Sequence, residues 1–496
     1  MTNPPHKTPR LLEAFIPIIF LIVFLFFNVF FVFKDDSLAG SNQLILLFSA
    51  AVAGSIAVFR LKTKWKTLQE GMVKSISAAL ASMIILLIIG ALAGTWLISG
   101  IVPAMIYYGL DLINPSVFLV AACLVSAVVS VATGSSWTTV ATIGIALLGI
   151  GKAMGLPEGM VAGAIISGSY FGDKMSPMSD TTNLAPAMAG TDLFTHIRSM
   201  TRTTIPTISV TLLIFLIIGL TRDFSTASIP VKNLQSAITH KFTITPWLFL
   251  VPAAVLIMIV KKMPAIPALL AGAIMGGIFA AIFQPDIVLE AAGETNSDSP
   301  NSQTLYKGIM TALYTDVSIA TPNKQVNELL STSGMAGMLN TIWLIMSAMI
   351  FGGIMEASGM LQRITQSIIG AVHSTGSLIA STVVTCGFFN ITASDQYLAI
   401  VVPGRMFADT YRKRGIRPEI LSRSLEDAGT VTSVLVPWNT CGAYQSGVLG
   451  VATGSYLPYC FFNILSPVVN ILWGYLFVKA DLLPKESEKE MAQVKI

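Results

Sequence analysis

Long apolar stretches recur along the whole of this chain and are separated by short polar segments. Each stretch contains about 20 residues, which is enough to cross a hydrocarbon core about 30 Å thick as a helix. The first one, residues 11–33, is too long for the core of a signal peptide and lacks a small-residue cleavage site, so it predicts a retained span. The pattern predicts an all-α, polytopic membrane protein that lies in the lipid bilayer.

The predicted spans fall into two halves that repeat the same order of elements. The first half, residues 1–220, has spans at 11–33, 41–60 and 72–100, a helical hairpin at 116–150, a broken helix at 157–190 and a span at 203–220. The second half, residues 246–480, has spans at 246–260, 263–284 and 333–357, a hairpin at 375–410, a broken helix at 418–450 and a span at 456–479. Three segments remain outside the spans: 221–245 and 285–332 are predicted as external surface loops, and 481–496 as a cytoplasmic tail.

Each half contains about five full crossings, and this odd number means that the second half enters the membrane from the opposite side. A single offset of 259 residues also aligns small and polar positions of the two halves. The aligned pairs are Gly94 with Gly353, Ser99-Gly100 with Ser358-Gly359, Thr133 with Thr392, and Ser135 with Ser394. One offset that holds in two separate elements argues against chance. We therefore expect two inverted-topology repeats.

Composition and charge agree with this topology. Of the 496 residues, 53% are hydrophobic and 11% are charged, against about 25% charged in soluble domains. If the N-terminus is cytoplasmic, the inner segments hold 22 of the 30 Lys and Arg residues, the outer segments hold 7, and Lys174 lies within the membrane. This asymmetry follows the positive-inside rule and predicts that both termini are cytoplasmic. The net charge of +4 is then a topology signal and does not imply a nucleic-acid partner.

The sequence argues against an enzyme and against a bound cofactor. The four cysteines are scattered singly, and no HExxH or GxSxG motif is present. The segment GIGKAMG at 149–155 fits neither the dinucleotide fingerprint nor the phosphate-loop pattern. A channel is a further alternative, but a channel filter is usually repeated across several subunits, whereas this chain pairs its polar segments internally.

Polar residues interrupt four of the apolar segments, and these breaks predict where the chemistry takes place. A broken helix is tolerated in a membrane only where protein or a water-filled cavity surrounds it, and transporters place such breaks at their binding sites. The breaks are ATGSS at 132–136, GDKMSPMSDTTN at 172–183, NITASD at 390–395 and EDAGTVTSVLVPWNT at 426–440.

The first two breaks predict a sodium site. Carboxylates are expensive inside a membrane and are therefore functional candidates, and a hard cation prefers oxygen ligands. Asp173 and Asp180 are the expected sodium-binding carboxylates. The remaining candidate ligands are Ser176, Ser179, Thr181 and Asn183 from the second break and Thr133, Ser135 and Ser136 from the first.

The other two breaks predict a second-repeat site that couples transport to protons. Glu426 and Asp427 are adjacent, and if both face one low-dielectric cavity their repulsion favours protonation of one of them. Asp427 corresponds roughly to Asp173 in the other half. The full candidate set of these two breaks is Ser394, Asp395, Glu426, Asp427, Thr430 and Asn439.

Structural roles remain open as alternatives for the same residues. Asp173 and Lys174 are neighbours, so they could form a buried ion pair that only fixes the break. Glu426 and Asp427 could cap the start of a helix and attract Arg423. Each hydroxyl could simply bond to the backbone of a helix end.

The segment GSYFGDKMSPMSDTTNLAPAMAGTDLFTHIR at 168–198 resembles the NhaC family of sodium/proton antiporters. The segments VATGSSWTT at 131–139 and SLEDAGTVTSVLVPWNTCGAY at 424–444 resemble the same family. The resemblance implies a secondary antiporter of the bacterial inner membrane, within the larger ion transporter superfamily. Its transported substrates would be sodium ions and protons, and its transport domain would move like an elevator against a scaffold that could form a homodimer.

A rival within transport is the sodium-coupled exchange of small organic anions such as malate and lactate. An organic carboxylate requires a fixed cation or helix N-termini in the cavity. Lys174 is the only cation that the sequence predicts to be buried, and it is not free if it pairs with Asp173.

Overall fold

The computed structural model describes residues 8–33, 40–112, 114–222, 231–294, 301–321, 327, 329–369 and 374–477. Eight of the described helices are long and apolar enough to cross a membrane, or ten if each of two bent helix pairs counts as one span. The only described strands, β1 (Val317–Ser318) and β2 (Ser331–Thr332), form a small antiparallel pair. The prediction of a helical, multi-pass membrane protein is confirmed, whereas the predicted tail at 481–496 lies outside the described residues.

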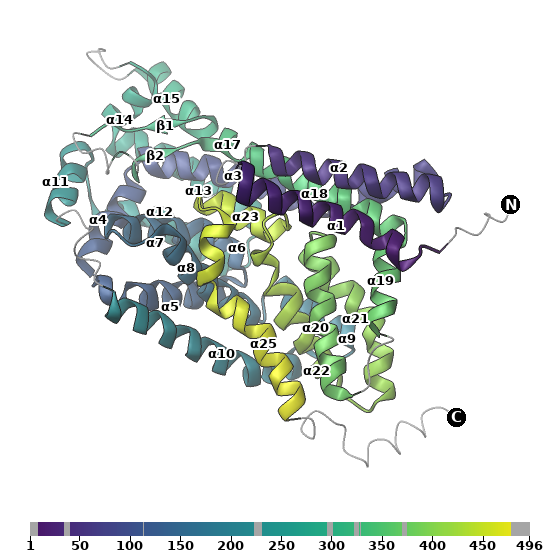
Figure 1. The fold of residues 1–496 in the computed structure, drawn as a ribbon. Helices are drawn as coiled ribbons and strands as arrows, with labels where there is room; N and C mark the ends of the chain where they lie inside the picture. Colours follow the sequence, from purple (N-terminus) through teal and green to yellow (C-terminus); the bar gives the residue numbers. More distant parts are fainter. Residues whose placement is uncertain are drawn as a thin grey trace.

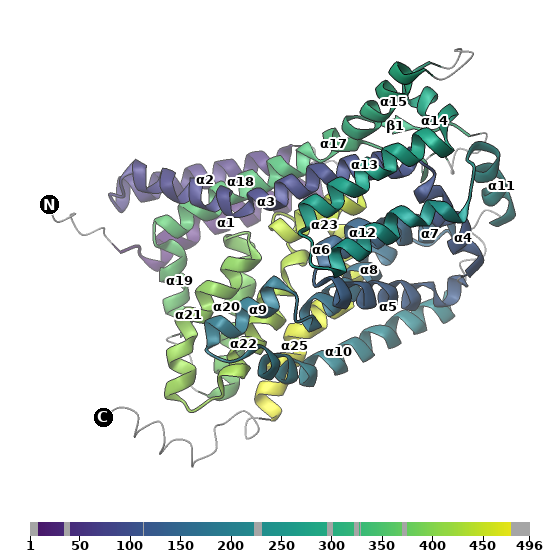
Figure 2. The same cartoon turned by 180° about the vertical axis from the view of Figure 1, so that it is seen from behind.

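One group of long helices forms a layer along the upper side of Figure 1, which we call the scaffold layer. It consists of α1 (Leu11–Phe27), α2 (Ser41–Ser55), α3 (Trp65–Ile98), α13 (Ala265–Phe283) and α18 (Leu339–Ala357). Helix α3 packs against α18 on one side and α13 on another, and the view from behind shows α13 running alongside it (Figure 2). The indole of Trp96 ties α3 to α13 by donating a hydrogen bond to the Gly272 carbonyl over 3.2 Å.

The remaining long helices lie below this layer in Figure 1 and form a second group, which we call the site body. Its first part contains α5 (Pro115–Thr133), α6 (Ser136–Thr139), α7 (Ile145–Ala153), α8 (Glu158–Met175), α9 (Asp180–Ala189) and α10 (Leu193–Thr221). Its second part contains α20 (Thr375–Thr392), α21 (Gln396–Lys413), α22 (Pro418–Leu425), α23 (Thr440–Leu449), α24 (Thr453–Tyr456) and α25 (Phe461–Leu476).

The chain reverses direction at two points in the site body. Between α5 and α6 the reversal uses Gly134, whose φ of +71° is the left-handed conformation that glycine adopts without cost. Between α20 and α21 it uses Ser394, with a φ of +59°, which is uncommon for a residue with a side chain. Asp395 follows and caps α21, because its carboxylate accepts the Leu398 N–H over 3.0 Å.

Two helices of the site body are interrupted. Helix α8 ends at Met175, and after Pro177 the hydroxyl of Ser179 caps the start of α9. Helix α22 continues into a π-helical turn at Glu426–Thr430 and a 3-10 turn at Ser433–Leu435 before Asn439 caps α23. The first interruption lies within the predicted broken helix at 157–190, and the second within that at 418–450.

The segments predicted as surface loops contain regular structure. In these two segments the structure has α11 (Val231–Lys241), α14 (Pro285–Ala291) and α15 (Ser302–Tyr314). Polar composition hid these three helices, although Asn301 and Thr304 form a capping box that starts α15. The η5 turn (Pro246–Phe249) and α12 (Leu250–Val260) coincide with the predicted span at 246–260, and α17 (Gly334–Gly337) lies at the start of the predicted span at 333–357. Two further helices, α4 (Ile101–Leu112) and α19 (Met360–Ile369), follow α3 and α18 and were not expected. Helix α10 also begins at Leu193 and not at 203, because Asp192 caps it.

Close packing of α8 on α5 generates a testable prediction. A Cβ on Gly168 of α8 would lie 2.0 Å from the carbonyl oxygen of Cys123, so the two backbones would have to separate. We expect Gly168→Ala to lower the free energy of unfolding by about 1–3 kcal/mol, measured as a lower melting temperature in detergent. The matched control is Gly387→Ala in α20, where the added Cβ has nothing within 4 Å. An unchanged melting temperature for Gly168→Ala would contradict this packing.

Candidate ion-binding site

A cavity of about 560 Å³ lies where the two chain reversals and the second break, at 172–183, meet α3 and the α12–α13 turn. Its walls therefore come from both the scaffold layer and the site body. The site body contributes Thr133, Gly134, Ser135, Trp137, Thr138, Asp173, Pro177, Met178, Ser179, Asp180, Thr181, Asn183, Gln396 and Tyr397. The other side contributes Ala81, Ser82, Ile85, Ile259, Lys262, Met263, Pro264 and Ala265.

Asp173 is the carboxylate held most firmly at the cavity wall. It lies near the end of α8 with 9% of its surface exposed. Its Oδ2 accepts the N–H of Ser136 over 2.9 Å and the hydroxyl of Ser136 over 2.6 Å. Ser136 begins the helical run Ser136–Ala153, so the carboxylate meets the positive end of that helix. Charge-assisted hydrogen bonds of this kind favour the ionised carboxylate.

The other polar residues of the first two breaks divide into those that hold the fold and those that face the cavity. Ser176 donates to the Val131 carbonyl over 2.8 Å, and Asn183 donates to the Pro177 carbonyl over 2.9 Å and to the Ser179 carbonyl over 2.7 Å, so both bond to the backbone around the break. Ser135 caps α6, and the hydroxyls of Thr133 and Thr139 lie 3.3 Å apart. Asp180 is exposed to the cavity. Ser176, Asn183 and Ser135 therefore fit the alternative in which a polar side chain only bonds to the backbone at a helix end.

Thr181 joins the second break to the fourth. Its hydroxyl donates to Glu426 Oε1 over 3.0 Å and lies 3.2 Å from the hydroxyl of Ser179. Glu426 is fully buried directly behind Thr181, and the charge of Asp173 acts on it. The structure thus gathers Asp173, Ser179, Thr181 and Glu426 into one cluster of oxygen atoms. Glu426 lies at the end of α22, so the alternative that it caps a helix start is wrong.

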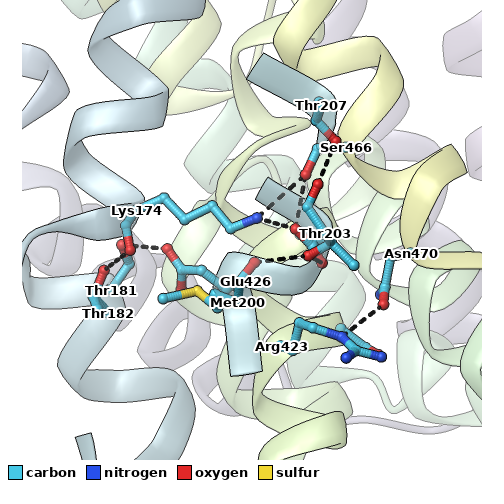
Figure 3. A network of polar contacts seen from close by, with 12 residues as sticks. Lys174, Thr181, Thr182, Met200, Thr203, Thr207, Arg423, Glu426, Ser466 and Asn470 are labelled. Carbon is cyan, nitrogen blue, oxygen red and sulfur yellow. Dashed lines mark hydrogen bonds and ion pairs between the residues drawn. The ribbon is translucent and has the colours of Figure 1, made fainter. Parts of the chain in front are cut away.

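Lys174 pairs with Asp427 and not with its neighbour Asp173. Both side chains are fully buried. Figure 3 shows the Lys174 side chain extending towards Thr203 and Ser466. Ser466 of α25 donates to Asp427 Oδ1 over 2.8 Å, and Thr203 of α10 donates to Oδ2 over 3.0 Å. The proposed Asp173–Lys174 pair is therefore wrong, because successive residues of α8 point in different directions.

Arg423 is directed towards α25. Its Nε donates to Asn470 Oδ1 over 3.2 Å, as Figure 3 shows, and its guanidinium lies 5.9 Å from the centre of the Trp473 ring.

The remaining second-repeat candidates lie around the second reversal. Asn439 donates to the Asn390 carbonyl over 3.0 Å, and Asn390 donates to the Gly429 carbonyl over 2.8 Å. Ser394 and Thr430 are buried nearby, while Asp395 caps α21. Asn390 and Asn439 thereby connect the end of α20 to the fourth break. None of these second-repeat candidates lines the cavity described above.

Sequence reasoning missed several polar residues of the site, among them Thr203, Ser466, Gln396 and Lys262. Thr203 and Ser466 lie in apolar spans, where a single hydroxyl gives no signal of its partner. Gln396 follows the third break, and Lys262 lies in a turn that the sequence marks only as a short polar link. Among the described residues, no group of three or more His, Cys, Asp and Glu side chains could hold a resident metal.

The chain is similar to known sodium/proton antiporters over most of its length. Residues 168–478 match the model of the Na+/H+ antiporter family. The chain is 38% identical over 435 residues to the Na+/H+ antiporter NhaC of Bacillus subtilis, covering 87% of this chain and 92% of that protein. It is 37% identical over 432 residues to NhaC of Alkalihalophilus pseudofirmus, covering 87% and 89%. It is also 35% identical over 471 residues to the malate-2H+/Na+-lactate antiporter of Bacillus subtilis, covering 95% of each. The resemblance seen in the sequence is confirmed: this chain belongs to the Na+/H+ antiporter family.

Proposed function

We propose that this protein exchanges sodium ions for protons across the bacterial inner membrane, and that sodium binds between Asp173 and Glu426. The hydrogen bond from Thr181 to Glu426 carries the proposal, because it joins two carboxylate-bearing breaks beside one cavity. The hydroxyls of Ser179 and Thr181 supply further oxygen ligands. Oxygen atoms of this kind suit a hard cation.

Competition between sodium and protons for the same oxygens accounts for exchange. Sodium requires ionised carboxylates, and protonation removes the negative charge that holds it. The hydrogen bonds from Ser136 hold the Asp173 carboxylate at the cavity wall, and the hydroxyl of Thr181 holds the Glu426 carboxylate beside it. A carrier that changes sides only when loaded with one or the other ion then couples the two gradients.

The inverted repeats and an elevator-like movement belong to the same proposal. The order of elements after α3 is repeated after α18, and both helices end at a glycine with positive φ, Gly100 at +81° and Gly359 at +75°. These glycines are related by the offset of 259 residues. Helices α4 and α19 then lead from the scaffold layer into the site body. Cytoplasmic termini, from the positive-inside pattern, and a homodimer through the scaffold layer complete this proposal.

The direct test is proton movement driven by sodium in proteoliposomes with an internal pH dye. We expect Asp173→Asn and Glu426→Gln each to weaken the apparent sodium affinity by about tenfold or more, equivalent to roughly 1.4 kcal/mol. Asp409→Asn is the matched control, because Asp409 is an exposed carboxylate that pairs only with Arg412 on α21. Wild-type sodium affinity and pH dependence in both site variants would rule out this sodium site.

Thr181→Val tests the hydroxyl that joins the two breaks. Valine keeps the shape of the side chain but removes the donor to Glu426, so the apparent sodium affinity should fall about 3- to 10-fold, equivalent to roughly 1 kcal/mol. Thr211→Val is the control, because that buried hydroxyl bonds only to the Thr207 carbonyl of its own helix. Equal sodium affinities of the two variants would show that Thr181 does not serve the site.

A second candidate function is the sodium-coupled exchange of a small organic anion. Lys262, held in the α12–α13 turn at a φ of +66°, lines the cavity opposite Asp173 and supplies the cation that an organic carboxylate needs. A volume of about 560 Å³ is also far larger than sodium requires and falls within the range of small-molecule sites. The similarity to a malate-2H+/Na+-lactate antiporter favours the same reading.

Uptake of labelled malate by proteoliposomes tests this second candidate. If it holds, a sodium gradient should drive malate accumulation, and Lys262→Ala should abolish it. Lys261→Ala should not, because the neighbouring Lys261 is exposed but does not line the cavity. Wild-type protein that moves protons but accumulates no malate would refute the organic-anion function and leave sodium/proton exchange intact.

A further inference from the structure

A second cavity, of about 450 Å³, lies between three helices of the scaffold layer, α2, α3 and α18. We call it the scaffold groove; both views show α2 and α18 side by side (Figures 1 and 2). Its mostly apolar lining includes Gly54, Phe59, Trp65, Met72, Ile350 and Ile354. The side chains of Phe59 and Trp65 are 72% and 59% exposed, so the groove opens towards the surroundings of the protein.

A basic segment lies next to the scaffold groove. Residues 60–66, with the sequence RLKTKWK, connect the π-helical turn η3 (Ile56–Arg60) to α3. They follow Phe59 directly and include Trp65, so the chain enters and leaves this segment at the groove. Residues 60–74 contain five cations and one carboxylate. The apolar groove therefore has a strongly positive neighbour.

Three lysines of the basic segment supply this positive charge. Arg60 and Lys74 are paired with Glu13 and Glu356 over 3.1 Å and 3.3 Å. No ion pair between described residues involves the other three cations of residues 60–74, which are exposed: Lys62, Lys64 and Lys66.

The backbone of the basic segment fixes where these lysines point. Lys62 has a φ of +58°, which is uncommon for a residue with a side chain. The N–H of Thr63 donates to the Ala57 carbonyl over 2.9 Å, and both Leu61 and Thr63 are buried. Buried and exposed residues alternate along the segment as a result, and the lysine side chains are presented on one outer surface.

The scaffold groove has about the depth of one membrane leaflet. Its lining residues on α2 and η3 extend from Leu47 to Phe59, which is roughly 18 Å at about 1.5 Å per residue. Half of a hydrocarbon core about 30 Å thick is about 15 Å. Since the basic segment follows Phe59, the positive charge lies at one end of the groove and apolar residues line the rest.

We propose that the scaffold groove binds an anionic phospholipid, with an acyl chain between α2, α3 and α18 and the headgroup on Lys62, Lys64 and Lys66. Basic residues at a membrane surface attract anionic headgroups, and tryptophans such as Trp65 lie at headgroup level. A second copy of the chain fits this groove less well. A two-fold interface centred on it would bring the same basic segment of both copies together.

The experiment measures thermal melting of the full-length protein in neutral detergent during a titration with lipid. It compares anionic phosphatidylglycerol with zwitterionic phosphatidylcholine carrying the same acyl chains. A ligand that binds the folded state raises its melting temperature, so we expect a lower half-saturating concentration for phosphatidylglycerol. In Lys62→Gln/Lys64→Gln/Lys66→Gln that concentration should rise about tenfold or more.

The matched control is Lys261→Gln/Arg412→Gln/Lys413→Gln, which removes three exposed cations that do not line the groove. It should respond to lipid as the wild-type protein does. Equal half-saturating concentrations of the two lipids in the wild-type protein, or equal effects of the two triple variants, would overturn the proposal. Glycerol phosphate carries the phosphate without acyl chains and should give no shift. A shift equal to that of the lipid would assign the lysines to free phosphate instead.

Gly54→Leu tests the apolar part of the site. An added Cβ on Gly54 lies 4.0 Å from Ile354 Cδ1 and therefore has room, and the rest of the leucine side chain would fill the groove. We expect a weaker response to phosphatidylglycerol although all three lysines remain. An unchanged response would overturn the proposal, and loss of a dimer in the same variant would assign the groove to a second copy. The lysine variant decides alone if Gly54→Leu does not fold, because its changes are on the surface.

Discussion

The arrangement depends on one constraint: a helix that breaks inside a membrane must find partners for the backbone groups it exposes. The protein meets this constraint with its own polar side chains. Ser176 in the second break bonds to the Val131 carbonyl of α5, and Asn439 in the fourth break bonds to the Asn390 carbonyl of α20. Because each break is tied to a chain reversal, the two reversals and the two broken helices come together around one polar interior.

The polar interior then separates residues that look alike in the sequence. Asp173 receives two hydrogen bonds from Ser136 at a helix start, Glu426 receives one from Thr181, and Asp427 receives an ammonium and two hydroxyls. These three carboxylates therefore lie close together in the fold but have three different sets of hydrogen-bond and charge partners. Differences of this kind let similar groups perform different tasks in one site.

Much of this could be predicted from the sequence because the bilayer restricts what a chain can do. Apolar length predicted the helical, multi-pass character, and the dense run of oxygen-bearing residues at 172–183 predicted one wall of the cavity. Because Asp173 and Lys174 are adjacent in the sequence, an ion pair between them was a natural expectation. It was wrong because successive side chains on a helix point in different directions, and Lys174 meets Asp427 from another helix. Thr203 and Ser466 could not be paired with Asp427 at all, since their spans are far apart in the chain and each offers only one hydroxyl. The helices α14 and α15 were hidden by polar composition.

One wall of the cavity comes from the side of the scaffold layer, yet the four residues proposed to bind sodium, Asp173, Ser179, Thr181 and Glu426, all belong to the site body. If the site body moves, a sodium ion bound there would move together with all four of its protein ligands. Apart from Lys262 and Ser82, the other wall of the cavity offers mostly apolar surface, from residues such as Ala81 and Ile85. If the proposed elevator-like movement holds, the moving helices alone would determine which ion is bound, and the scaffold layer would determine only on which side of the membrane the ion can leave.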